Sequence, residues 1–151
     1  MTIKKNSTIA ETVTVLFIIL FLYTGISKLM DYSVFKEQIA TSPLLAPVAP
    51  LIAAVLPWLE FAVIALLAIP RWRLKGLYMS LLLMLIFTCY IIAILTLNKH
   101  IPCSCGGVIE LLSWNEHIIF NSAFIILGIM GVVFQRKVKR ESTIILGAIR
   151  G

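Results

Sequence analysis

The chain has 151 residues, of which 60% are hydrophobic and 13% are charged, and its mean hydropathy is +1.02. Soluble domains are nearer half apolar and a quarter charged, and so short a chain cannot hide this excess in one core. The composition therefore argues against a soluble enzyme, a disordered chain and a disulfide-rich scaffold. The formal net charge of +6 does not indicate nucleic-acid binding, because the cations flank apolar runs instead of clustering on a soluble face.

Four apolar segments each come close to the roughly 20 residues that cross a bilayer as a helix. They cover residues 12–30, 47–69, 74–97 and 114–134, and a basic tail follows at residues 135–151. Because a backbone in lipid must satisfy its own hydrogen bonds, we expect all four to be helical. The sequence predicts a single all-α membrane domain, an antiparallel four-helix bundle. A cleaved signal peptide is the alternative for the first segment, disfavoured by its length and by the lack of a small-residue cleavage site.

The distribution of cations predicts the orientation of these helices. Ten Lys and Arg residues lie near the chain ends or between the second and third segments, namely Lys4, Lys5, Arg71, Arg73, Lys75, Arg136, Lys137, Lys139, Arg140 and Arg150. The other side has only Lys28, Lys36 and Lys99. The positive-inside rule then predicts cytoplasmic termini and outward-facing loops at residues 31–46 and 98–113. We expect a bacterial inner-membrane protein with these two loops in the periplasm.

The first outer loop has the pattern of a short helix. Between residues 33 and 41, Val34, Phe35 and Ile39 alternate with charged and amide side chains, and Pro43 follows. This spacing predicts an interfacial helix lying on the outer membrane surface. The alternative is a re-entrant edge packed on the bundle.

The second outer loop holds two cysteines separated by one serine, Cys103 and Cys105. Disulfides form outside the cytoplasm, and a bridge closing so small a ring should be strained and therefore labile. Lys99 and His100 lie close enough in sequence to favour a thiolate. Three interpretations follow: a redox-active dithiol, an inert structural bridge, or part of a metal site. The third is the weakest, because two sulfurs and one histidine make an incomplete ligand set.

Two further residues lie inside the apolar segments. Glu60 falls near the middle of the second segment, and an intramembrane carboxyl is a functional-site hypothesis by default. We expect it to be neutral because burial disfavours the charge, and to relay protons, contact a quinone, or serve as a hydrogen-bonded packing group. Cys89 lies about 13 Å along the third segment from its outer end. It is interpreted as a small buried hydrophobe, with a third redox thiol as the alternative.

The fourth segment begins with a capping-box pattern at Ser113 and Glu116. His117 and Asn121 follow four residues apart, which places them on one helix face, with Trp114 one turn earlier. They are interpreted as packing and interfacial anchoring groups, or as side chains that point toward Glu60 or the thiols.

The chain resembles the MauE/DoxX group of small four-helix membrane proteins. The resemblance rests on Tyr-Thr-Gly-Ile-Ser-Lys-Leu at residues 23–29, Phe35, Ser42-Pro43, Leu-Pro-Trp-Leu-Glu at residues 56–60 and Pro-Cys-Ser-Cys-Gly at residues 102–106. The last motif favours the MauE type. That resemblance implies a role in methylamine utilisation, where such proteins are thought to assist disulfide formation in methylamine dehydrogenase with a thioredoxin-like protein.

The resulting hypothesis is an inner-membrane thiol–disulfide redox protein, a possible oxidoreductase. Cys103 and Cys105 would exchange with a periplasmic thioredoxin-like partner, supported by Lys99, His100 and Glu60, with a membrane quinone as a possible cofactor and no metal. The alternatives are a non-catalytic membrane subunit or assembly factor with a structural cysteine clip, and a small transporter, which a single intramembrane carboxyl disfavours.

Overall fold

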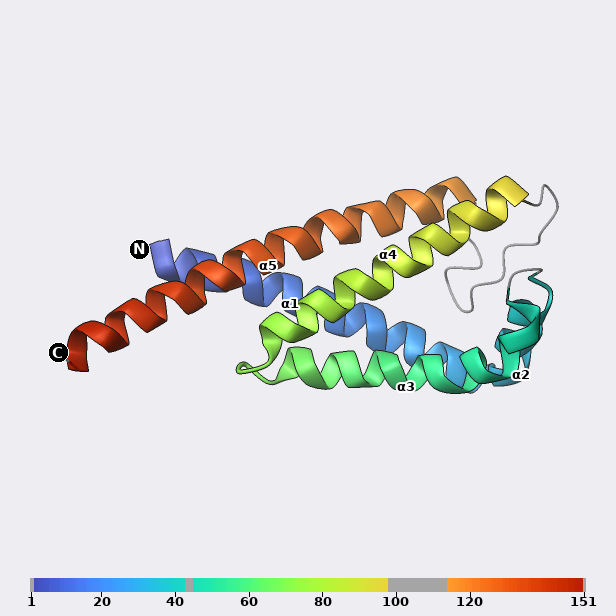
Figure 1. The fold of residues 1–151 in the computed structure, drawn as a ribbon, viewed down its shortest axis with the longest axis horizontal. Coiled ribbons are helices and arrows are strands. Elements are labelled where there is room, and N and C mark those ends of the chain that lie inside the picture. Colours follow the sequence, from blue (N-terminus) through green and yellow to red (C-terminus); the bar gives the residue numbers. More distant parts are fainter. Residues whose placement is uncertain (1, 43–44, 98–113, 151) are drawn as a thin grey trace.

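The computed structural model describes residues 2–42, 45–97 and 114–150, and every regular element in these ranges is a helix (Figure 1). In chain order the elements are α1 (Thr2–Met30), α2 (Tyr32–Ala40), the short 3-10 helix η1 (Ala46–Val48), α3 (Ala49–Ala68), α4 (Arg73–Leu97) and α5 (Trp114–Arg150). Four of them contain stretches long and apolar enough to cross a membrane, namely Lys5–Met30, Ala46–Ala68, Arg73–Ala93 and Glu116–Ile145. The predicted all-α fold with four membrane-spanning helices is confirmed.

The four long helices form a closed ring in which α1 and α4 each pack against both α3 and α5. Both chain termini lie at one end of the bundle, which we call the terminal end, and the turn between α3 and α4 also faces this way (Figure 1). Helix α2 lies at the opposite end, which we call the α2 end. Neighbouring helices along the chain therefore run antiparallel, as predicted.

Aromatic side chains of α1 occupy the centre of the bundle. Phe17 and Phe21 are buried, and Phe17 packs edge-on against Phe124 of α5 with the ring centroids 5.5 Å apart. Leu67 of α3 and Leu77 of α4 are fully buried in the same core. Close packing of this kind, and not hydrophobicity as such, holds helices together in lipid, because the lipid tails are as apolar as the core.

The turn from α3 to α4 brings two backbones into close contact at Gly76. A Cβ atom at this position would lie 2.8 Å from the backbone nitrogen of Leu67 and 3.0 Å from the carbonyl carbon of Leu66. Real Cβ atoms do not approach backbone so closely, so a residue without a side chain is required there. Gly76 therefore sets the tight spacing of α3 and α4 at the terminal end.

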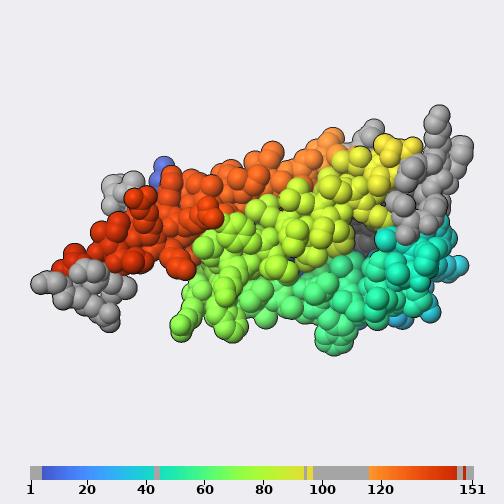
Figure 2. Space-filling model, viewed as in Figure 1, coloured from blue at the N-terminus to red at the C-terminus, as the bar shows by residue number. Residues whose placement is uncertain are grey.

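Helices α1 and α5 both extend further than the apolar pattern predicts. Helix α1 begins at Thr2 instead of residue 12, and α5 continues to Arg150 instead of ending near residue 134. Neither extension contains a proline, and no glycine interrupts α5 between Gly131 and Gly147, so nothing in the local sequence ends either helix. With 37 residues, α5 is about 55 Å long, longer than the hydrocarbon core. Its C-terminal part projects beyond the bundle (Figure 2).

The short helix predicted in the first outer loop is present as α2. Its apolar side chains Phe35 and Ile39 are buried and pack with Ala49 and Ala53 of α3. The intervening side chains Lys36 and Glu37 are exposed. Helix α2 therefore caps the bundle through one apolar face, which is the geometry of an amphipathic interfacial helix.

Basic side chains gather at the terminal end. Lys5 lies near the start of α1, Arg71 lies in the α3–α4 turn and Lys75 lies in the first turn of α4. Arg73 of α4 lies 3.8 Å from Glu11 of α1. Helix α5 adds Arg136, whose guanidinium lies 5.4 Å from the ring centroid of Tyr78. This charge asymmetry between the two ends of the bundle is the physical basis of the orientation proposed below.

Candidate functional site

The centre of the candidate site is an ion pair between α1 and α3. Lys28 lies in the last turn of α1, near the α2 end, and Glu60 lies in the middle of α3. The Lys28 Nζ donates a hydrogen bond of 2.8 Å to the Oε1 of Glu60. The Lys28 residue is 8% exposed and Glu60 only 1%. Two opposite charges are therefore held together in the apolar interior of a membrane bundle.

Gly25 allows this approach of the two helices. A Cβ atom at this position would lie 3.3 Å from the Oε2 of Glu60 and 3.3 Å from the Cζ of Phe61. A larger residue would therefore push α1 away from the carboxylate. Gly25 and Lys28 are three residues apart and lie on the same face of α1. The face of α1 that contacts Glu60 therefore consists of Gly25, which has no side chain, and Lys28, which has a long cationic one.

The ammonium of Lys28 has partners on three helices. Besides Glu60, its Nζ donates a hydrogen bond of 3.3 Å to the backbone carbonyl oxygen of Thr24, one turn earlier in α1. It also lies 5.7 Å from the centroid of the Phe35 ring of α2, within the range of a cation–π interaction. Three directions of the ammonium are thus used by a carboxylate, a carbonyl and an aromatic face. Lys28 joins α1, α2 and α3 at one point.

Only one of the two carboxylate oxygens of Glu60, Oε1, accepts a hydrogen bond from Lys28. Its Oε2 is fully buried and has no hydrogen-bond partner among the described residues. A buried polar atom without a partner costs about 1–3 kcal/mol, and more when charged. Such an atom in a native fold calls for an explanation. The nearest available donor is the hydroxyl of Thr24 on α1, which also bonds the carbonyl oxygen of Phe21 at 3.3 Å.

Sequence reasoning singled out Glu60 but missed its partner. Lys28 was counted among the cations on the outer side, whereas the structure places its ammonium 2.8 Å from the carboxyl of Glu60. The signal was present in the spacing along α1. The buried residues Val13, Phe17, Phe21, Gly25 and Lys28 follow one another at intervals of three or four, so Lys28 continues the buried stripe of the helix.

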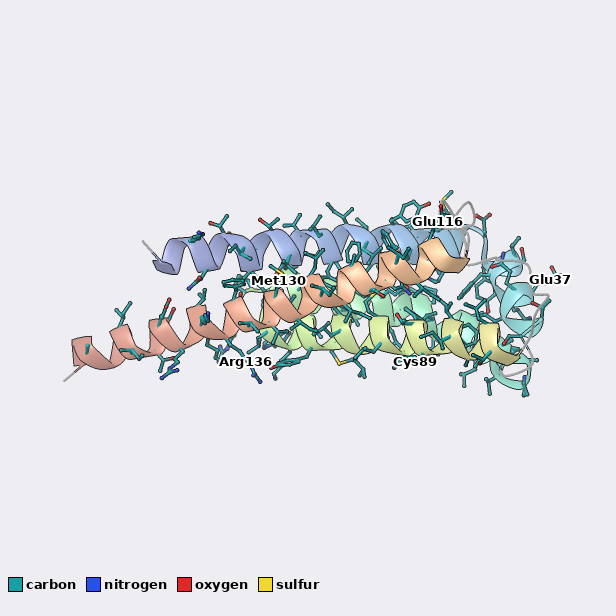
Figure 3. All side chains as sticks on the ribbon, turned by 90° about the horizontal axis from the view of Figure 1, so that it is seen from above. Glu37, Cys89, Glu116, Met130 and Arg136 are labelled. Atoms are coloured by element: carbon teal, nitrogen blue, oxygen red, sulfur yellow. The ribbon has the colours of Figure 1, made fainter. Side chains whose placement is uncertain are left out.

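The prediction that Cys89 is a buried hydrophobe is wrong. Its side chain is exposed, and it points away from the other helices on the outer side of α4 (Figure 3). In a membrane this face of α4 meets lipid. An apolar environment suits a thiol on either side of the helix, which is why composition alone cannot distinguish the two faces.

His117 and Asn121 both lie on the inner face of α5. His117 is 6% and Asn121 4% exposed, so they are part of the bundle interior and not interfacial anchors. The Nδ1 of His117 has no hydrogen-bond partner in the described part of the chain. No hydrogen bond or ion pair joins either residue to Glu60 within the described ranges. The structure thus groups Glu60 with Lys28 at the α1–α3 seam, apart from the α5 pair.

The cysteine motif lies outside the described residues. Cys103, Cys105, Lys99 and His100 belong to the segment 98–113 that follows α4 and precedes α5. The described ends of these two helices, at Leu97 and Trp114, both lie at the α2 end of the bundle (Figure 1). Within the described ranges, no group of three or more His, Cys, Asp or Glu side chains has the arrangement of a metal site.

These features define a multi-pass membrane protein: four apolar helices, a surface helix over one end and a buried ion pair beneath it. Comparison of the sequence with family models assigns the family. The model described as methylamine utilisation protein MauE matches residues 6–134, so the chain belongs to the MauE family. The match covers α1 from residue 6 onward, α2, α3 and α4, the cysteine motif, and α5 as far as residue 134. No curated protein and no solved structure matches the chain.

Proposed function

We propose that this chain is a membrane thiol–disulfide redox protein that exchanges with a periplasmic thioredoxin-like partner through Cys103 and Cys105. The observation that carries the proposal is the Cys-Ser-Cys motif within the residues matched by the MauE family. In this exchange one thiolate attacks a disulfide sulfur of the partner, a mixed disulfide forms, and one partner thiol leaves. The second cysteine then displaces the remaining partner sulfur, which leaves the partner reduced by two electrons and the Cys103–Cys105 pair oxidised; in reverse, the pair oxidises the partner.

The proposed orientation places this chemistry in an oxidising compartment. The gathering of basic side chains at the terminal end supports cytoplasmic termini in a bacterial inner membrane. The α2 end, where α4 ends and α5 begins, then faces the periplasm. Disulfides form and persist in that compartment, whereas the cytoplasm keeps thiols reduced.

Neighbouring charges have supporting roles in the proposal. Lys99 and His100 precede Cys103 by four and three residues, and a nearby cation favours the thiolate form that reacts. His117 and Asn121 lie in the first turns of α5, at the same end of the bundle. The Lys28–Glu60 pair lies deeper in the membrane, and its half-satisfied carboxylate is the group that would take up a proton linked to thiol oxidation.

Trapping of the mixed disulfide tests the proposal. Cys105 is followed by two glycines, which favours access to its sulfur, so we assign it as the attacking residue and Cys103 as the resolving one. Cys103→Ser should then accumulate a covalent adduct with a thioredoxin-like protein, visible on a non-reducing gel and lost with reductant, and Cys105→Ser should not. Cys89→Ser is the matched control and should leave exchange unchanged. Trapping by Cys105→Ser alone would exchange the two roles.

A structural clip gives a different outcome in the same experiment. If neither single variant traps a partner, and the variant lacking both cysteines still supports disulfide formation in the client, the thiols are not redox-active. The chain would then be a non-catalytic membrane subunit or assembly factor.

A further inference from the structure

Two cations and an aromatic ring meet on the outer face where α4 and α5 pack together near the terminal end. The guanidinium of Arg136, on α5, lies 5.4 Å from the ring centroid of Tyr78, on α4. Lys75 precedes Tyr78 by three residues, so the two lie on the same face of α4. All three side chains are exposed, and Figure 2 shows α4 and α5 side by side on one surface of the molecule. This cluster, which we call the α4–α5 basic cluster, therefore takes one cation from each of two helices.

The charges of the α4–α5 basic cluster are not neutralised by the described part of the chain. Among the described residues, no carboxylate forms an ion pair with Lys75 or Arg136. The contact with the Tyr78 ring directs the guanidinium and leaves its charge in place. A guanidinium presents paired N–H donors that match the spacing of phosphate oxygens, and an ammonium adds a further donor and charge. An anionic phosphate group is therefore the ligand that this cluster fits.

Apolar side chains continue from the α4–α5 basic cluster along both helices, toward the middle of the bundle. The residues in line with it are Leu82 and Leu85 of α4 and Ile129 and Val133 of α5, each between 44% and 52% exposed. From Lys75 to Leu85 this stripe extends about 15 Å, which is half of a hydrocarbon core about 30 Å thick. Arg136 lies on the same side of the bundle as the outward-facing Cys89 (Figure 3). A phosphate site thus lies at one end of an apolar surface one leaflet deep.

We propose that this face of α4 and α5 binds an anionic phospholipid of the leaflet at the terminal end. The lipid phosphate accepts hydrogen bonds from the Arg136 guanidinium and the Lys75 ammonium, and an acyl chain lies along Leu82, Leu85 and Val133. A zwitterionic lipid carries an ammonium of its own, which the two cations repel, so a lipid with a net negative charge is preferred. The bound lipid bridges α4 and α5 from outside, at the level where Tyr78 lies.

Native mass spectrometry of the full chain in detergent tests the site. The delipidated protein is titrated with phosphatidylglycerol and, separately, with phosphatidylethanolamine that has the same acyl chains. We expect one saturable site that prefers phosphatidylglycerol about tenfold, because nearby cations attract the anionic lipid. Glycerophosphoglycerol, which is the headgroup without the chains, should not displace the lipid. Equal affinity for the two lipids, or displacement by the soluble headgroup, would overturn the proposal.

Two double variants with the same loss of charge make the test specific. Lys75→Gln with Arg136→Gln removes both cations of the α4–α5 basic cluster, so phosphatidylglycerol binding should weaken about tenfold. Lys139→Gln with Arg140→Gln is the matched control, which removes two exposed cations further along α5 and should bind as the parent does. All four side chains are exposed, so both variants should keep the helical circular dichroism of the parent. Equal weakening in both would show that the net charge of this end attracts the lipid, and no weakening in the first would show that the cluster does not bind it; either result would refute the site.

Discussion

Breaking the Lys28–Glu60 pair should have a large effect on stability, and removing both charges a small one. Lys28→Met leaves a carboxylate that is 1% exposed without its counter-ion, and Glu60→Gln does the same to the ammonium. Removing one partner of a buried ion pair typically costs about 3–5 kcal/mol, whereas replacing both by uncharged groups is often neutral. We therefore expect each single variant to lose about 3–5 kcal/mol of unfolding free energy, and the double variant to stay within about 1 kcal/mol of the parent.

The assay is a double-mutant cycle on the unfolding free energy in mixed micelles, followed by circular dichroism as the denaturing detergent is increased. The cycle isolates the pairwise interaction, which these values place at about 5 kcal/mol or more. Lys36→Met is the control, because Lys36 is an exposed lysine of α2 and its loss should change stability by less than about 0.5 kcal/mol. A coupling of only about 0.5 kcal/mol, the value of a solvent-exposed ion pair, would refute the reasoning.

Two other predictions concern packing and topology. Gly76→Ala should destabilise the protein by about 1–3 kcal/mol, because its Cβ would lie 2.8 Å from the backbone nitrogen of Leu67. Gly25→Ala should lose less stability, because the nearest atoms to its Cβ are 3.3 Å away. Thermal unfolding of both variants measures the two losses. In intact spheroplasts a membrane-impermeant maleimide should label the reduced Cys103 and Cys105 but not a cysteine introduced at Arg73. Cys89 should react only with a lipid-soluble maleimide. Labelling of the Arg73 position from outside would reverse the proposed orientation.

The sequence predicted the number and type of helices well. The four apolar runs and the Phe35–Ile39 pattern of α2 are properties of single segments, and a membrane leaves the helix as the only solution for each long run. The segments predicted to begin at residue 12 and to end at residue 134 are shorter than the helices, which begin at Thr2 and end at Arg150, because the apolar run marks only the part that fits in lipid. The polar continuation contains good helix formers, and nothing in it ends the helix.

Which face of each helix is buried was harder to predict. In a soluble protein the buried stripe is the apolar one, but in a membrane both the interior and the lipid-facing surface are apolar. Cys89 was therefore placed inside the bundle, although it faces outward. Polar residues in apolar runs are the better guide, and Glu60 was recognised on that basis. Lys28 was missed because it lies close to the end of its segment, where lysines usually reach toward the membrane surface.

The contact between Lys28 and Phe35 makes α2 more than a cover over one end of the bundle. The ring of Phe35 stabilises an ammonium that also holds Glu60, so a protein that docks on α2 and shifts this ring changes the electrostatic field at a carboxylate inside the membrane. By thermodynamic reciprocity, a change in the charge of Glu60 alters the affinity of α2 for that protein by the same factor. The position of the Phe35 ring on α2 and the charge of Glu60 on α3 are thus coupled through Lys28, which contacts both side chains.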